Sequence, residues 1–155
     1  MLKLSNRMNE NNFITTSVKK TQKIAEVLAG KLVPGDFLAF YGDLGSGKTT
    51  FIQGLAKALG INRRIISPTF IIVRTYDLKS ENKSFKQFYH IDLYRTSTVN
   101  DLLGIGLDQV IKDKSSIVAL EWAEKMGDLL PQKRYEVHMS NEGDDKRKIK
   151  ILKYG

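Results

Sequence analysis

Cysteine is absent from this sequence of 155 residues. Its absence excludes disulfides, thiol catalysis, zinc–thiolate sites and iron–sulfur clusters. No apolar run approaches the roughly 20 residues that a membrane-spanning helix needs. Residues 1–12 are polar and rich in asparagine, without the apolar core of a signal peptide. We therefore expect a cytoplasmic protein with no membrane contact.

Acidic residues are fewer than basic ones, and the net charge is +8. The positive charge is mostly lysine and is spread along the whole chain. Arg63–Arg64 and Lys146–Lys148 are the only dense basic spots, and neither is interleaved with aromatic residues as a base-stacking surface would be. The composition therefore indicates a basic surface but does not identify a nucleic-acid site.

A glycine-rich segment, Gly42–Thr50, fits the phosphate-binding pattern G-x-x-x-x-G-K-[ST]. The backbone N–H groups of such a loop can turn inward and cradle phosphate oxygens. Lys48, expected on the exposed loop, can reach the β- and γ-phosphates, and the Thr49 hydroxyl can bind Mg²⁺. The expected nucleotide-binding residues of the loop are Gly42, Asp43, Leu44, Gly45, Ser46, Gly47, Lys48, Thr49 and Thr50.

The flanking segments match the loop. Phe37–Tyr41 is a short apolar run typical of a buried parallel strand, and Lys48–Leu59 predicts a helix that ends at Gly60. A strand, loop and helix in this order direct a helix N-terminus at an anion. The alternative to a phosphate-binding loop is a glycine-rich turn followed by an unrelated helix.

The other segments predict a single α/β domain. An earlier helix runs from Ser17 to Ala29, with Ile24, Val27 and Leu28 expected to be buried. The remaining pattern predicts a mostly parallel central sheet with antiparallel hairpins added. The further strands are 70–78, 85–94, 117–121, 134–140 and 146–154. The further helices are 97–111, interrupted at Gly104 and Gly106, and 123–130.

A carboxylate follows the apolar run Ile117–Leu120, which is the pattern of a Walker B strand. Glu121 is therefore the expected acid beside Mg²⁺. The pattern usually carries aspartate, and the longer glutamate favours contact through a bound water. The alternative is a glutamate that only ends a strand in solvent.

Polar side chains alternate along the strand that contains Asp92. His90, Asp92 and Tyr94 project on one face and are costly to bury without partners, so we expect them to face a polar cleft. Asp92 is expected to orient water or hold Mg²⁺, and Arg95 to neutralise phosphate charge. His90 is expected only as a supporting residue. An exposed edge-strand face is the alternative.

Four motifs together resemble the TsaE family (formerly YjeE), across residues 15 to about 131. The family contains bacterial ATPases required for threonylcarbamoyl modification of tRNA. Residues 1–12 fall outside the family pattern, so we expect a polar extension there and a P-loop ATPase domain over 13–155. The matching motifs are Gly42–Thr50, Ser67–Phe70, His90–Arg95 and Glu121–Glu124.

The resemblance implies a P-loop fold that binds ATP and Mg²⁺, with Thr49 and Glu121 at the metal. It also implies roles for four further positions. Thr69 would sense the γ-phosphate, Asp92 would serve hydrolysis, Trp122 would line the pocket and Thr16 would lie near the adenine. For Trp122, ordinary core packing is an equal alternative. The expected catalytic residues are thus Lys48, Thr69, Asp92 and Glu121.

The resemblance also implies partners. The TsaD and TsaB proteins would carry out transfer to the adenosine next to the anticodon, in tRNAs that read codons beginning with A. This chain would support them by hydrolysing ATP slowly on its own, and would meet tRNA indirectly, with direct contact an open question. Two alternatives stay open: a small-molecule kinase of the P-loop class, and an ATP-gated module that binds RNA.

Overall fold

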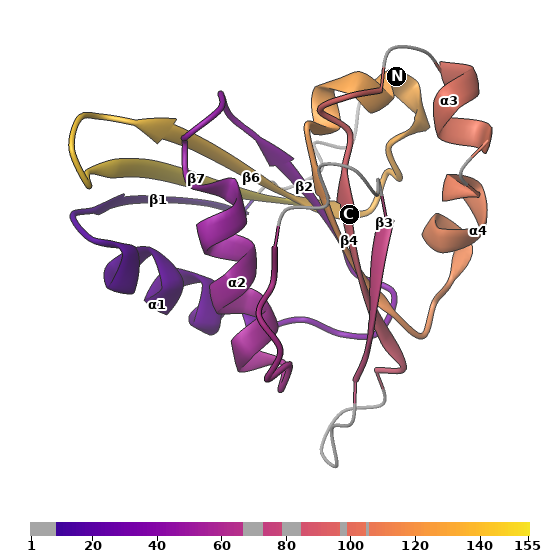
Figure 1. Cartoon of the computed structure of the whole chain (residues 1–155), viewed down its shortest axis with the longest axis horizontal. Helices are drawn as coiled ribbons and strands as arrows, with labels where there is room; N and C mark the ends of the chain where they lie inside the picture. Colours follow the sequence, from indigo (N-terminus) through magenta and orange to yellow (C-terminus); the bar gives the residue numbers. More distant parts are fainter. Residues whose placement is uncertain (1–8, 67–72, 79–84, 97–98, 105) are drawn as a thin grey trace, which may run out of the picture.

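The computed structural model describes residues 9–66, 73–78, 85–96, 99–104 and 106–155. These residues form one sheet and five helical segments (Figure 1). The strands are β1 (Asn9–Thr15), β2 (Phe37–Tyr41), β3 (Val73–Asp77), β4 (Gln87–Asp92), β5 (Ile117–Glu121), β6 (Arg134–Asn141) and β7 (Arg147–Tyr154).

The sheet order is β1-β7-β6-β2-β5-β4-β3. In its centre β6, β2, β5 and β4 run parallel to one another. The outer pairs, β1 with β7, β7 with β6, and β4 with β3, are antiparallel. The predicted α/β fold, with a mostly parallel centre and added hairpins, is confirmed. The turn expected at 79–84 lies outside the described residues.

The helical segments cover both faces of the sheet (Figure 1). The helix expected over 97–111 is divided near Gly104 and Gly106, as its glycines predict, into two short helices, and the last segment is a 3₁₀ helix. Within the described ranges, no helix has the length and apolar character to cross a membrane. The segments are α1 (Val18–Ala29), α2 (Lys48–Ala58), α3 (Val99–Gly104), α4 (Leu107–Lys112) and η1 (Ala123–Leu129).

Two apolar cores fill the spaces between these layers. Phe40 and Leu38 of β2 point to the core under α1 and α2, where Phe51 is fully buried. Phe37 and Ala39 point to the other core, under α4 and η1. Both faces of β2 are therefore covered, which explains its unbroken apolar sequence.

Helix α1 begins and ends as its sequence predicts, but its buried face differs. The Ser17 side chain accepts a hydrogen bond from the Lys20 backbone N–H at 3.1 Å, so it caps the helix. Val27, which we expected to be buried, is 54% exposed. Leu28 is buried as expected and Ile24 packs partly buried against the core, and the buried face also includes Thr21 and Ala25.

Strand β1 begins at Asn9, inside the segment 1–12 that the sequence sets apart as an extension. It pairs along its whole length with β7, from Asn9 opposite Lys153 to Thr15 opposite Arg147. Most of its side chains are exposed, because it is an edge strand. The boundary expected at residue 13 therefore falls within a strand, which polar composition alone did not predict.

Candidate nucleotide-binding site

The phosphate-binding loop joins the end of β2 to the start of α2. Gly42 and Gly47 have φ angles of 146° and 101°, a region that favours glycine. A Cβ atom on Gly42 would also lie 2.6 Å from Ser46 Oγ. Glycine is therefore required at this turn for both conformational and steric reasons.

Lys48 is buried, with 5% of its surface exposed, although we expected it on an exposed loop. Its Nζ donates to the backbone carbonyls of Gly42 and Asp43, the second at 3.0 Å, and lies 4.4 Å from the centre of the Trp122 ring. Burial lowers the pKa of the Lys48 ammonium, and the carboxylate of Glu121 acts in the opposite direction. The side chain is thus folded over its own loop.

A cavity of about 360 Å³ opens beside this lysine. Strands β4, β5 and β7 contribute to its wall together with the loop and α2, so its residues come from all along the chain. The lining residues are Leu44, Gly45, Ser46, Gly47, Lys48, Thr49, Thr50, Asp92, Tyr94, Glu121, Trp122 and Arg147.

Two cavity residues, Thr49 and Glu121, form a series of hydrogen bonds with the buried His90. Thr49 Oγ1 donates to Glu121 Oε1 at 3.1 Å, and His90 Nε2 lies 2.7 Å from Glu121 Oε2. Both His90 and Glu121 are buried. The carboxylate expected after a Walker B strand is therefore in contact with the hydroxyl expected to bind the metal, and it does not point into solvent.

Thr49 and Glu121 are a donor set that suits Mg²⁺. The ion is commonly held by one or two protein oxygens, with water and substrate phosphates completing its shell. Across the described residues no cluster of three histidine, aspartate or glutamate side chains offers an all-protein cage. One hydroxyl and one carboxylate beside a phosphate-binding loop therefore fit magnesium.

His90 was expected only as a supporting residue, and the structure places it against Glu121. An ionised carboxylate only accepts hydrogen bonds, so the tautomer of His90 that donates to Glu121 is the one with its proton on Nε2. Its other ring nitrogen, Nδ1, is buried and has no hydrogen-bond partner in the described part of the protein. One nitrogen of His90 is thus committed to orienting Glu121.

Asp92 lies one strand away from Glu121 at the same level of the sheet, because these two residues are paired in register between β4 and β5. Its Oδ1 accepts a hydrogen bond from the Tyr94 backbone N–H at 3.0 Å. Asp92 is mostly buried and lines the cavity. The structure therefore brings both expected acids to one side of the phosphate-binding loop.

Two other predicted residues, Thr16 and Arg95, do not line the cavity, and a third falls outside the described residues. Thr69, with the loop Ser67–Phe70, falls outside the described residues. Thr16 is exposed before α1, accepts a hydrogen bond from Lys20 Nζ and does not line the cavity. Arg95 is exposed and also absent from the cavity lining.

Arg147 is the cavity residue that sequence reasoning missed. Its Nε would lie 3.6 Å from a Cβ atom placed on Gly47. Its Nη1 donates to Asn141 Oδ1 at 3.1 Å and to the Asp144 carbonyl at 2.8 Å, so the β6–β7 turn holds it in place. The basic spot Lys146–Lys148 was visible in the sequence, but its position beside the loop depends on the sheet.

Comparison with known proteins agrees with this geometry. The family "Threonylcarbamoyl adenosine biosynthesis protein TsaE" matches residues 15–149. The chain belongs to the TsaE family. A TsaE protein of Bacillus subtilis is 36% identical over 148 residues, covering 96% of this chain and 89% of the relative. A TsaE protein of Borreliella burgdorferi is 39% identical over 118 residues, covering 76% and 82%.

A solved structure extends the likeness to three dimensions. The crystal structure of YdiB from Bacillus subtilis superposes with a TM-score of 0.77 at 32% sequence identity. The match covers 97% of this chain and 90% of that chain. The P-loop fold inferred from the motifs is therefore the fold of a family relative.

The contact between His90 and Glu121 leads to a testable expectation. Replacing His90 with phenylalanine should weaken Mg²⁺-dependent ATP binding about 10–100-fold, as is common when a residue supporting a metal ligand is removed. His90→Gln should recover part of the loss, because its amide can donate to Glu121. Mg²⁺ titrations of nucleotide binding, with thermal unfolding as a check on the fold, measure both. Equal losses in the two variants would contradict an orienting role.

Proposed function

We propose that this chain binds Mg²⁺–ATP in the cavity beside Lys48 and hydrolyses it in the cytoplasm. We further propose that it serves the biosynthesis of tRNA threonylcarbamoyladenosine, the process named for its relatives. The observation that carries the ATPase proposal is the 3.1 Å contact between Thr49 and Glu121 beside a phosphate-binding loop. A loop that held phosphate only for structural reasons would not need this pair.

The residues of the site divide the work. The loop N–H groups and the ammonium of Lys48 would bind phosphate oxygens, once Lys48 exchanges its carbonyl partners for them. Thr49 and Glu121 would hold Mg²⁺, which supplies positive charge to the phosphates. Asp92, at the level of Glu121, would orient the attacking water. Trp122, whose ring covers Lys48, would limit access of bulk water to the charged groups.

Arg147 adds a second fixed cation to this side of the loop. We expect Arg147→Gln to weaken ATP binding about tenfold, since a charge-assisted hydrogen bond to phosphate is among the stronger polar contacts. Lys148→Gln is a matched control, because it removes the same charge from the next residue of β7, which does not line the cavity. Calorimetric titration with ATP compares them. Equal affinities of the two variants would exclude Arg147 from the nucleotide site.

The partners follow from the same proposal. Threonylcarbamoyl transfer would belong to TsaD and TsaB, and ATP hydrolysis by this chain would enable their turnover on tRNAs that read codons beginning with A. In P-loop enzymes a partner often supplies charge or positions the water. The segment with Thr69 is the proposed sensor of the γ-phosphate, by the family motif.

Hydrolysis rates with and without the partners test the proposal. The purified chain should hydrolyse ATP slowly, only with Mg²⁺, and faster when the TsaD–TsaB complex is added. Thr69→Ala should blunt that increase more than it lowers ATP binding. A fast enzyme that is indifferent to the complex and transfers phosphate to a small acceptor would instead identify a kinase.

A further inference from the structure

A second hollow, separate from the nucleotide cavity, lies between α1 and α2 and has a volume of about 660 Å³. None of its residues lines the nucleotide cavity. Its wall is rich in lysine side chains from both helices. We call this hollow the lysine groove. The lysine groove is lined by Lys19, Lys20, Gln22, Lys23, Glu26, Gly54, Lys57 and Ala58.

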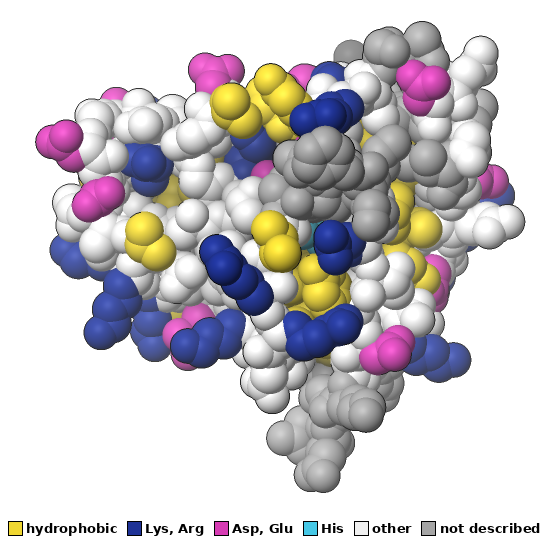
Figure 2. Space-filling model, in the orientation of Figure 1, with side chains coloured by type: hydrophobic (Ala, Val, Ile, Leu, Met, Phe, Trp, Pro, Cys, Tyr) yellow, Lys and Arg dark blue, Asp and Glu magenta, His cyan; other side chains and the backbone are white. Residues whose placement is uncertain are grey.

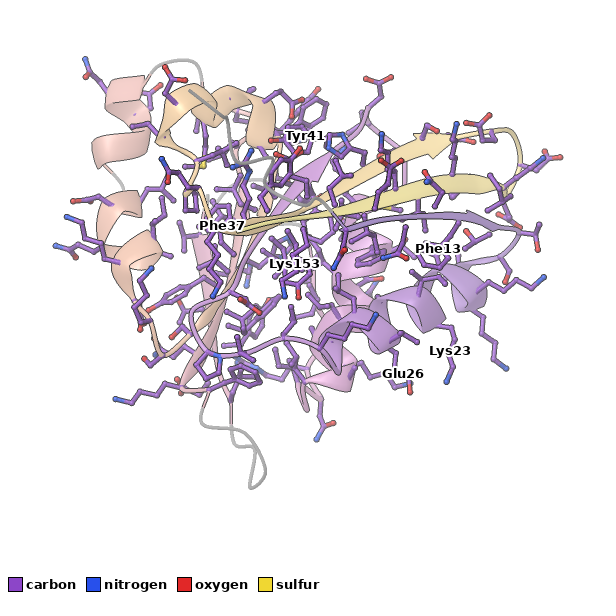
Figure 3. All side chains as sticks on the ribbon, turned by 180° about the vertical axis from the view of Figure 1, so that it is seen from behind. Phe13, Lys23, Glu26, Phe37, Tyr41 and Lys153 are labelled. Atoms are coloured by element: carbon purple, nitrogen blue, oxygen red, sulfur yellow. The ribbon has the colours of Figure 1, made fainter. Side chains whose placement is uncertain are left out.

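The floor of the lysine groove is a close approach of the two helices. A Cβ atom on Gly54 of α2 would lie 2.8 Å from the Cα atom of Gln22 in α1. Glycine therefore lets the helix backbones meet, and the longer side chains on either side rise as the rims. Lys23 and Glu26 point away from the sheet on one rim (Figure 3).

The charges of the lysine groove are poorly balanced. Its one acid, Glu26, pairs with Lys23 at 3.2 Å on the surface. Lys19 and Lys57 are exposed and form no ion pair or side-chain hydrogen bond with any described residue. Lysine and arginine side chains gather over this face of the molecule in Figure 2. The hollow therefore presents uncompensated positive charge.

Helix stability does not account for the lysines of α1. The first turn of α1 contains Lys19 and Lys20 and no acid, although cations are unfavourable near a helix N-terminus. Lys19 and Lys23 are also four residues apart, where like charges repel. Sequences depart from such local rules mainly at functional sites. An anionic ligand would relieve both repulsions.

We propose that the lysine groove binds the phosphate backbone of RNA. The choice of RNA as the ligand rests on the proposed role in tRNA modification. If the proposal holds, this protein contacts tRNA directly. Lysines from two helices converge on a concave surface, which fits a polyanionic strand better than a flat membrane. Because the groove and the nucleotide cavity share no residue, one protein can bind RNA and ATP together.

Binding of a fluorescent tRNA transcript over a series of salt concentrations tests the proposal. Wild-type protein should bind, with affinity falling as salt rises. Lys19→Gln/Lys57→Gln should make the slope of log affinity against log salt less steep by about 1.4–1.8, the loss expected for two phosphate contacts. Lys112→Gln/Lys114→Gln removes the same charge near α4 on the other face of the sheet and should leave the slope near the wild-type value.

Three results would overturn the proposal: no tRNA binding by wild-type protein at low salt, equal losses in the two double variants, or binding to phosphatidylglycerol vesicles but not to tRNA. The affinity for ATP, measured on the same samples, should be equal in the wild-type protein and in both double variants. If the wild-type protein does not bind ATP, the proposed ATPase function is contradicted, but RNA binding by the lysine groove is not.

A stability measurement separates ligand binding from folding. Lys19→Glu places an acid in the first turn of α1, so it should raise the melting temperature by about 1–3 °C while weakening tRNA binding. Opposite changes in stability and affinity support a binding role for Lys19. A lower melting temperature would show that Lys19 stabilises the fold, and would overturn the argument from charge placement.

Discussion

Lys48→Ala is expected to lower ATP binding and hydrolysis on the order of 10²–10³-fold. The ammonium lies in the cavity beside the phosphate-binding loop, together with Asp92, Glu121 and Trp122, where water is partly excluded and charges interact more strongly. In the structure it binds loop carbonyls, so in the free protein it also holds the loop together. Alanine removes both contributions at once.

A second substitution separates the contribution of the Lys48 charge to ATP binding from its contribution to the stability of the loop. Lys48→Met keeps most of the aliphatic stem that packs in the loop and removes only the charge. Both variants should lose ATP binding, but Lys48→Met should unfold closer to the wild-type temperature. Calorimetric titration with ATP and thermal unfolding give the two readouts. A folded Lys48→Met protein with a normal rate of hydrolysis would refute the phosphate-loop interpretation.

Substitutions of the two acids, Glu121 and Asp92, are expected to affect different steps, nucleotide binding and turnover respectively. Glu121→Ala should weaken Mg²⁺-dependent nucleotide binding, because Glu121 is the carboxylate in contact with Thr49. Asp92→Ala should lower turnover on the order of 10²–10³-fold with a smaller effect on affinity, as is typical when a group acting on the transition state is lost. Single-turnover rates and Mg²⁺ titrations of ATP binding distinguish the two outcomes.

The buried contact with His90 requires a control for Glu121. Alanine leaves His90 Nε2 without its acceptor, and an unsatisfied buried donor costs about 1–3 kcal/mol. Glu121→Gln keeps an oxygen for His90 and removes the negative charge. If Glu121→Gln retains full Mg²⁺ affinity while Asp92→Ala hydrolyses ATP at the normal rate, both assignments are wrong.

Local signals in the sequence were sufficient for the elements around the nucleotide site. Strand Phe37–Tyr41 has the predicted bounds, and the helix after the loop begins at Lys48 as predicted. Each is specified by neighbours along the chain: an apolar run, glycines where φ is positive, and a helix that follows. The phosphate-binding motif, the apolar strand that ends at Glu121 and the family were therefore all identifiable from the order of the residues.

Tertiary structure alone decided how distant residues combine. The register of β4 against β5 sets Asp92 beside Glu121 and puts His90 beneath the same carboxylate. The β6–β7 hairpin brings Arg147 to the loop, about 100 residues after Gly47 in the chain.

The edge strand β1 and the lysine groove also depend on contacts between distant segments of the chain. The polar segment from Asn9 becomes a strand only because β7 offers it a free edge. Lys57 and Lys19 line one hollow only because Gly54 lets α1 and α2 approach. Periodicity and capping act over a few residues, so they determine the elements of this protein. Strand register and helix crossing depend on contacts between segments far apart in sequence, which no local pattern records.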